Sequence, residues 1–194
     1  MPGHAAASPR TPPRDKLLAA AVDYVAEHGV ADLRLRRLAA ALGTSHRMLI
    51  HHFGSKEGLL VEVVRVVEQR QRAALAELRT DPGLSVDEIG RRFWQRLTDP
   101  DLNRNERLFF EVYSQALQGR PWALPLLDGV VDDWLEPLGE LVATPGTPRA
   151  TARADARLAL AVARGLLLDL LATGDREATD AAMDRYQVLR GSRA

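Results

Sequence analysis

Apolar residues recur every three or four positions along most of the chain, the spacing that places them on one face of an α-helix. In the N-terminal part this pattern predicts helices over about 13–28 and 35–42. A third, brief helix fits about 45–52, because Ser45 is a favourable N-cap residue. Gly43 lies in the short turn between the second and third helices, where chain reversal is expected.

The pattern continues to the end of the chain and predicts six more helices. Asp81-Pro82-Gly83 is a strong helix stop, and Pro125 and Pro137 are expected to bend or interrupt the helix that contains them. These six helices fit residues 55–79, 85–98, 102–117, 122–142, 149–172 and 175–189. The pattern therefore predicts an all-α fold of about nine helices.

Composition supports this fold class and narrows the chemistry. Hydrophobic residues make up 46% and aromatic residues 5% of the chain, and the helix formers Ala, Leu, Arg and Glu dominate. The chain has no cysteine, which excludes disulfides, thiolate metal sites and a cysteine nucleophile. Met1–Pro13 lacks the apolar region of a secretory signal, and Arg164 and Asp169 interrupt the most apolar stretch. We therefore expect a soluble, cytoplasmic protein without a membrane span.

The net charge is zero, but it is unevenly distributed. Residues 1–60 hold 8 Lys and Arg against 5 Asp and Glu, and residues 61–194 hold 18 against 21. A DNA duplex attracts local positive charge near its phosphates rather than global charge. The N-terminal excess is therefore compatible with DNA binding.

The second and third predicted helices form a helix-turn-helix pattern, running from about Leu33 to Lys56. In this motif the second helix enters the major groove. Arg47 is the best candidate to bind guanine, Met48 suits a thymine methyl group, and Lys56 suits a phosphate. The predicted DNA-binding residues are Arg34, Arg36, Arg37, Ser45, His46, Arg47, Met48, His51, His52 and Lys56.

Two other interpretations of these residues were weighed. The three arginines are also compatible with an ordinary solvated helix face, although the adjoining turn favours DNA. The histidines are compatible with a metal site, but His51 and His52 are neighbours that point about 100° apart on a helix and are poorly placed to chelate together. We therefore expect no metal and no cofactor.

The segment from Leu33 to Leu60, with its Gly-x-Ser turn and the run His52-Phe53-Gly-Ser-Lys56, resembles the TetR-type repressor family. The resemblance is specific over about residues 15–60. It departs from the family pattern at Ile50 and His51, where the family often has a tyrosine. It implies a DNA-binding head followed by a helical domain in which the middle helices hold a small-molecule pocket and the last two form a dimer.

This resemblance and the helix pattern together suggest three segments. They are a disordered tail over 1–13, a DNA-binding domain over 14–60, and an effector-binding and dimerisation domain over 61–194. Glu111 and Asp169 lie within apolar runs and suit either polar groups of the pocket or positions that face water. The expected pocket residues are Phe93, Trp94, Phe110, Tyr113, Trp122 and Trp134.

The expected dimer surface is an apolar stripe with small residues on the last two helices, although such stripes also occur in monomer cores. It comprises Leu158, Ala161, Val162, Gly165, Leu168, Ala178, Ala182, Tyr186 and Leu189.

These features predict a dimeric repressor that leaves a palindromic, double-stranded operator when it binds a small-molecule effector. A transcriptional activator with the same head and a helical protein-interaction module are the alternatives. An enzyme is not expected, because the chain contains no Gly-x-Ser-x-Gly, no phosphate-binding Walker loop and no His-Glu-x-x-His, and all five histidines precede residue 53.

Overall fold

The computed structural model describes residues 14–30, 33–143 and 146–191, and within these ranges all regular secondary structure is helical. This confirms the all-α prediction. The predicted tail over 1–13 lies outside the described residues. The helices are α1 (Arg14–His28), α2 (Leu35–Ala41), α3 (His46–Phe53), α4 (Lys56–Arg79), α5 (Val86–Leu97), α6 (Asn103–Leu117), α7 (Asp132–Val142), α8 (Arg149–Thr173) and α9 (Arg176–Gly191).

The clearest difference from the predicted helices lies between 122 and 142. Pro125 falls in a short 3-10 turn, Leu124–Leu127, and α7 begins only at Asp132. Pro137 remains inside α7 without ending it. A second 3-10 turn, Pro100–Leu102, leads directly into α6.

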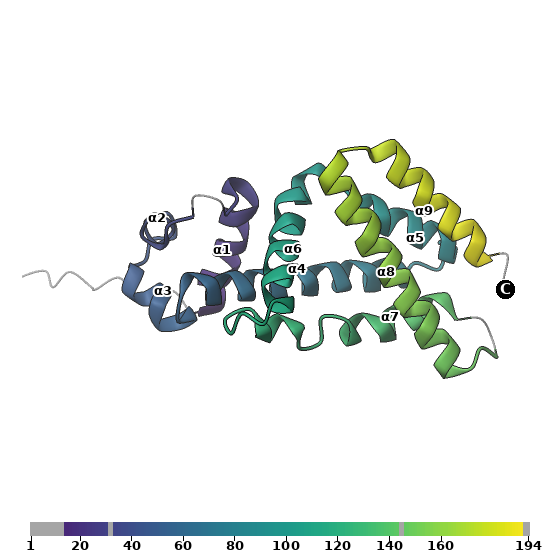
Figure 1. Ribbon diagram of the computed structural model, residues 1–194, viewed down its shortest axis with the longest axis horizontal. Helices are drawn as coiled ribbons and strands as arrows, with labels where there is room; N and C mark the ends of the chain where they lie inside the picture. Colours follow the sequence, from purple (N-terminus) through teal and green to yellow (C-terminus); the bar gives the residue numbers. More distant parts are fainter. Residues whose placement is uncertain (1–13, 31–32, 144–145, 192–194) are drawn as a thin grey trace, which may run out of the picture.

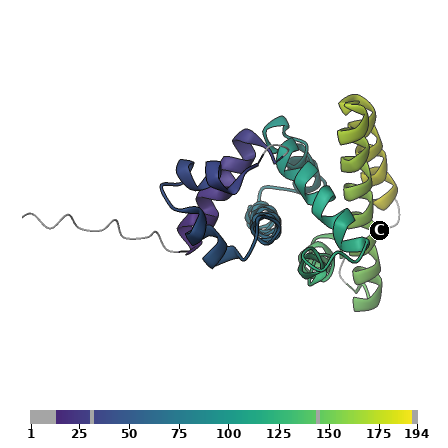
Figure 2. The same ribbon diagram turned by 60° about the vertical axis from the view of Figure 1, so that its left-hand side comes forward.

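Helix α4 runs the length of the molecule and connects its two ends (Figure 1). Helices α1, α2 and α3 form one end, and α8 and α9 form an outer layer at the other, as the turned view also shows (Figure 2). Helix α7 packs on α8, α8 packs on α9, and both α1 and α6 pack on α4. The chain thus places the predicted reading helices and the predicted sensor helices on opposite parts of one shared helix.

The core of the N-terminal helices is continuous with that of the following segment. Leu17, Leu38 and Leu49 are buried in the same cluster as Leu59 of α4 and Leu108 of α6. The predicted domain boundary at residues 60 and 61 falls within α4, so the backbone crosses it without a break. The packing shows no gap at this boundary, so the division into a DNA-binding domain and an effector-binding domain stays a prediction about function.

Two serines begin the helices that hold the reading element. The Ser45 hydroxyl accepts a hydrogen bond from the Met48 amide at 3.2 Å at the start of α3, and the Ser55 hydroxyl accepts one from the Gly58 amide at 2.9 Å at the start of α4. At Gly58 the first turn of α4 lies so close to the end of α3 that an added Cβ would collide with the carbonyl oxygen of Phe53. The backbone of Phe53 therefore requires glycine at this position.

We predict that Gly58→Ala destabilises the protein by about 1–3 kcal/mol, the usual cost of forcing atoms into packed space. The Gly139→Ala variant is the control, because its added Cβ meets Ala152 and Ala156 only at ordinary contact distances of 3.6 and 3.9 Å. Alanine there is expected to be neutral or slightly stabilising, since it is the better helix former. Urea denaturation of both variants checks this, and equal stabilities would contradict the close approach at Gly58.

Candidate DNA-reading head and ligand cavity

The reading helix α3 is amphipathic and is held by its inner face. Leu49 and Phe53 are buried against the core, while Leu38 and Ala39 bury the inner face of α2. Arg14 fixes the end of α3 from α1, because its guanidinium lies 5.2 Å from the centre of the Phe53 ring and bonds Glu62 of α4 at 2.8 Å. The polar face of α3 is thereby turned to solvent.

Most of the predicted DNA-binding residues lie on that outward face or next to it. In the described part of the chain, no side-chain hydrogen bond or ion pair engages the arginines of α2 and α3, so their charges are available to a ligand. Met48 and Lys56 are half-buried. The exposed members of the set are Arg34, Arg36, Arg37, Ser45, His46, Arg47 and His51.

His52 differs from the other predicted DNA-binding residues, and the structure corrects its assignment. Its ring lies edge-on to Phe53 and His51, with centroids 6.1 and 5.2 Å away, and its Nε2 atom is shielded from solvent. The rotation of about 100° per residue that exposes His51 turns His52 towards the core. His52 therefore does not present Nε2 on the reading surface.

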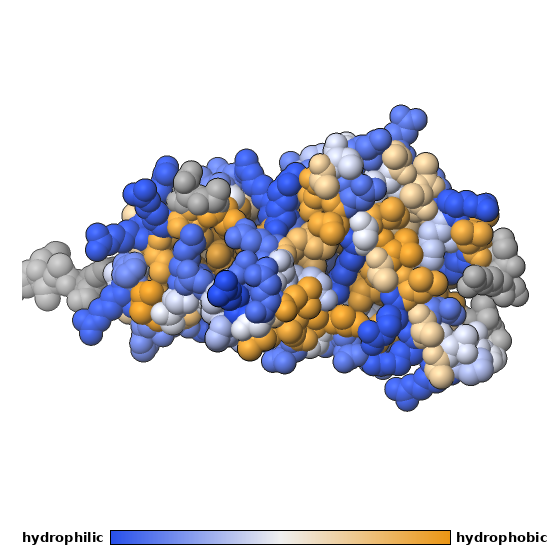
Figure 3. All heavy atoms as spheres, viewed as in Figure 1, coloured by the Kyte–Doolittle hydropathy of each residue, from blue (hydrophilic) through white to orange (hydrophobic). Residues whose placement is uncertain are grey.

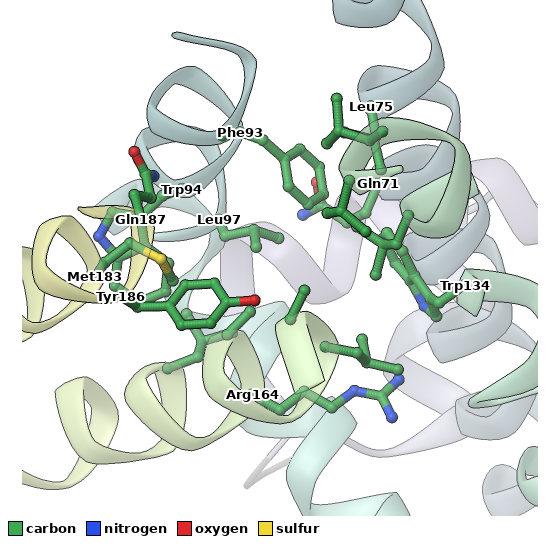
Figure 4. Close-up of a pocket in the computed structure, with 18 of the residues that line it drawn as sticks. Gln71, Leu75, Phe93, Trp94, Leu97, Trp134, Arg164, Met183, Tyr186 and Gln187 are labelled. Atoms are coloured by element: carbon green, nitrogen blue, oxygen red, sulfur yellow. The ribbon is translucent and has the colours of Figure 1, made fainter. Parts of the chain in front are cut away.

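A cavity of about 110 Å³ lies among α4, α5, α6, α7, α8 and α9 and is partly open to solvent. Figure 4 shows Phe93, Trp94, Trp134 and Tyr186 around it, with Arg164 at one side. Its wall is largely apolar and aromatic, with a few polar side chains, which is the usual constitution of a small-molecule site. The polar side chains are therefore the groups that would orient a ligand.

Glu68 of α4 holds one part of this polar set. The indole N–H of Trp134 donates to its carboxylate at 2.7 Å, and the guanidinium of Arg164 approaches it at 3.4 Å. Arg164 also donates to the Val130 carbonyl at 2.7 Å and stacks over the Phe109 ring at 5.0 Å. Burial raises the pKa of Glu68 despite these partners, and burial lowers the pKa of Arg164.

Glu106 of α6 is the second buried carboxyl group, and only 5% of it is exposed. Among the described residues, the one side chain that hydrogen-bonds it is Gln71, whose amide nitrogen lies 3.3 Å away. Gln71 in turn accepts a hydrogen bond from Arg96 at 3.2 Å. Burial, reinforced by the nearby charge of Glu68, raises the pKa of Glu106 to about 7.

The comparison with known proteins agrees with this geometry. Residues 17–63, which contain the head and the start of α4, match the family model "Bacterial regulatory proteins, tetR family". The head of this chain therefore resembles that of the TetR family.

Similarity to curated transcriptional regulators is confined to part of each chain. The HTH-type transcriptional regulator BetI of Stenotrophomonas maltophilia is 33% identical over 70 residues, which cover 36% of this chain and 36% of the relative. The HTH-type transcriptional repressor AcnR of Corynebacterium glutamicum is 36% identical over 80 residues, 41% of this chain and 40% of that one. The chain thus matches well under half the length of these relatives.

Structural similarity extends further along the chain. A transcriptional regulator from Saccharomonospora viridis, solved in complex with choline, is 25% identical and has a TM-score of 0.64. The match covers 89% of this chain and 94% of that one. A TetR transcriptional regulator from Legionella pneumophila is 19% identical, with a TM-score of 0.66 over 92% of this chain and 99% of that one. The whole helical arrangement, and not only the head, therefore matches the fold of a solved TetR-type regulator.

Four of the six aromatic residues expected in the TetR-type pocket line the cavity, namely Phe93, Trp94, Phe110 and Trp134. Two do not. Tyr113 and Trp122 pack instead against the core that the N-terminal helices share with α6, so the structure corrects their assignment. In the sequence, these two aromatic residues cannot be distinguished from the four that line the cavity. Only the direction of each side chain in the folded protein distinguishes them.

The polar groups of the cavity were not identified by sequence reasoning. Glu111 and Asp169 are both exposed and do not line the cavity, whereas Glu68 and Glu106 do line it. A signal for Glu106 existed, because it lies three residues before Phe109 and shares its helix face. An acidic residue on the apolar face of a helix is a better candidate for a cavity-lining group than one whose neighbours in the sequence are apolar.

The predicted dimer stripe is largely exposed, which leaves it without a partner in the single chain. Leu168 is 51% exposed, and Figure 3 shows hydrophobic side chains gathered along α8. Two members are exceptions that the structure corrects. Val162 packs against the core beside Leu167, and Tyr186 faces the cavity. The exposed members are Leu158, Ala161, Gly165, Leu168, Ala178, Ala182 and Leu189.

The described residues show neither a membrane-spanning helix nor a metal-binding cluster. No helix in those ranges has the length and apolar character needed to cross a membrane. Across the same residues, no group of three or more His, Asp or Glu side chains is arranged to hold a metal ion.

We predict that Glu106→Gln stabilises the protein at pH 8 by roughly 1–3 kcal/mol and changes its stability little at pH 5. The carboxyl ionises near 4.5 in the unfolded chain but near 7 in the folded one. The folded state therefore binds more protons between these values, and the free energy of unfolding falls as the pH rises through them. Glutamine removes this penalty and can still accept the hydrogen bond from Gln71.

Urea denaturation at both pH values measures this effect. The matched control is Glu111→Gln, on the same helix but exposed, which is expected to change stability little at either pH. A destabilisation by Glu106→Gln that is equal at pH 5 and pH 8 would contradict a buried, mostly protonated carboxyl group.

Proposed function

We propose that this protein is a dimeric transcriptional repressor that leaves a palindromic DNA operator when a small molecule occupies its cavity. The observation that carries the proposal is the course of α4, which begins beneath the reading helix at Lys56 and forms a wall of the cavity at Glu68, Gln71 and Leu75. A ligand that favours one position of α4 would also change the position of the head.

The charge and exposure of the head support the DNA-binding step. We propose that Arg47 reads guanine, that Met48 contacts a thymine methyl group, and that Lys56 and the arginines of α2 bond phosphates. Ser45 and His46 lie at the N-terminal end of α3, which enters the groove in this motif. His51 takes the place of the family's usual tyrosine at the phosphates. We propose that the protein acts in the cytoplasm, because its operator DNA lies there. The proposed function includes no catalytic step.

The relatives support the regulatory step. AcnR is a transcriptional repressor, and the regulator from Saccharomonospora viridis was solved with choline, a small organic molecule. In this chain the mainly apolar cavity supplies a space for such a molecule. We therefore propose that the effector binds in the cavity lined by Phe93, Trp94, Phe110 and Trp134.

We predict that Arg47→Ala abolishes specific operator binding and leaves the fold unchanged, because the side chain is exposed and carries no structural contact among the described residues. Loss of one bidentate base contact costs about 1–3 kcal/mol of discrimination. Gel shifts on DNA selected from a random library, and on the DNA flanking the protein's own gene, measure this.

Arg120→Ala is the matched control, since Arg120 is exposed but lies outside the head. Binding by the native protein should also weaken steeply with salt, with a logarithmic slope of about −0.9 for each phosphate neutralised. An unchanged operator affinity of Arg47→Ala would contradict the role of Arg47 in reading the DNA. A binding constant that does not depend on salt concentration would contradict duplex binding altogether.

We also predict that Leu168→Glu converts the protein from a dimer to a folded monomer of 21.4 kDa. The new charge would lie on the exposed stripe of α8, where it would be desolvated in a symmetric interface. Leu117→Glu is the control, because Leu117 is even more exposed, at 67%, but lies on α6 away from the stripe. Sedimentation equilibrium distinguishes the states, and a dimer that survives Leu168→Glu would place the interface elsewhere.

A further inference from the structure

The ionisable groups that line the cavity do not balance one another. They include two carboxyl groups, Glu68 and Glu106, and two guanidinium groups, Arg164 and Arg190. Arg190 is already paired with Asp87, which lies outside the cavity lining, at 2.5 Å. The cavity itself therefore has two acids and one available base.

Arg164 is committed to Glu68 rather than to Glu106. Its guanidinium approaches Glu68 at 3.4 Å and donates to the Val130 carbonyl at 2.7 Å, and the Phe109 ring covers one of its faces. No ion pair among the described residues reaches Glu106, whose carboxylate is hydrogen-bonded by the neutral amide of Gln71. Glu106 is thus a buried acid without an ion-pair partner in the described part of the chain, and the charge of Arg164 reaches it only through space, beyond ion-pair distance.

The remaining wall suits a positive charge carried on an apolar body. Phe93, Trp94, Phe110, Trp134 and Tyr186 all line the cavity, and Figure 4 shows four of them around its space. Aromatic faces attract cations through their quadrupoles, most strongly where water is excluded. An anion would instead face two carboxyl groups, and a neutral ligand would leave Glu106 without a partner.

We propose that the cavity selects organic cations with an aromatic or otherwise apolar body, and that Glu106 is the carboxylate that meets their charge. The inference rests on the proposed function for its biological role and names the chemical class of the effector. Glu68 acts differently, because Trp134 and Arg164 already contact its carboxylate.

This assignment makes ligand binding depend on pH. The groups that face Glu106 are Glu68 and Gln71 of α4 and Arg164 of α8, with Arg96 of α5 behind Gln71. In the free protein Glu106 is half protonated near pH 7, and a cation would bind its ionised form and release the proton. The affinity for a cation should therefore rise about tenfold between pH 6 and pH 8, whereas that for a neutral ligand should not.

A pair of probes that differ in charge but hardly in shape tests the proposal. 4-(2-Trimethylammonioethyl)phenol is a cation whose hydroxyl stays protonated at pH 8, and 4-(3,3-dimethylbutyl)phenol replaces its nitrogen with carbon. Titration calorimetry, with the fluorescence of Trp94 and Trp134 as a second readout, measures binding of each to the purified protein without DNA. At pH 8 we expect the native protein to prefer the cation by about tenfold or more.

Two variants separate charge recognition from packing. Glu106→Gln should remove the preference for the cation and its pH dependence, while binding of the phenol stays within about twofold, since shape is retained. Glu111→Gln should behave as the native protein. The proposal is overturned if the native protein binds both probes equally, if it shows no cation binding at millimolar concentration, or if Glu106→Gln keeps the preference.

A second titration on the protein–DNA complex separates this proposal from the proposed function. Release of DNA by the cation and not by the phenol supports both. Cation binding without DNA release overturns the effector role of the cavity and leaves the ligand class standing. Release of DNA by both probes equally overturns the cation preference and leaves the repressor function standing.

Discussion

Because α4 is one uninterrupted helix of 24 residues, its first turn and its cavity-facing middle cannot shift independently. Its first turn is capped by Ser55 and held against the carbonyl of Phe53 by the absence of a side chain at Gly58. About three and four turns after the start of α4, Glu68 and Gln71 reach the cavity. The head is therefore rigidly connected to the polar groups that a ligand would contact.

These polar groups are costly to the fold. A buried carboxyl group without a cationic partner loses its hydration and gains little in return, and Glu106 responds by holding its proton to about pH 7. Leucine or methionine at this position would pack the same space without that cost. A ligand that supplies the missing positive charge would recover the lost stabilisation, so the same residue that weakens the free protein would strengthen its complex.

The outer layer, formed by α8 and α9, exposes apolar side chains that no other part of the described chain covers. Exposed leucines of α8 and α9 alternate with alanine and glycine, which allows another helix pair to approach closely. A two-fold contact through this layer would set the distance between two reading heads and hence the spacing of the operator half-sites. The interface, the cavity and the head would then all depend on the packing of α8 and α4 around one space.

The sequence alone determined the helices, their order and the helix-turn-helix, because these follow from local rules: a helical repeat of apolar residues, Ser45 and Ser55 as caps, and glycine at turns. It also singled out Arg47, since an exposed position on a short amphipathic helix can be read from its spacing.

The direction of a side chain in the packed interior was not determined in this way. Phe110 and Tyr113 are three residues apart on one helix, yet only Phe110 lines the cavity, and Glu106 rather than Glu111 is the acid within it. Which face of α6 meets the cavity depends on how α4 and α8 pack against it. That packing also brings together residues as far apart in the sequence as Glu68 and Arg164, which are separated by 96 positions. Only the tertiary structure brings such residues together, because no local pattern encodes the distance between them.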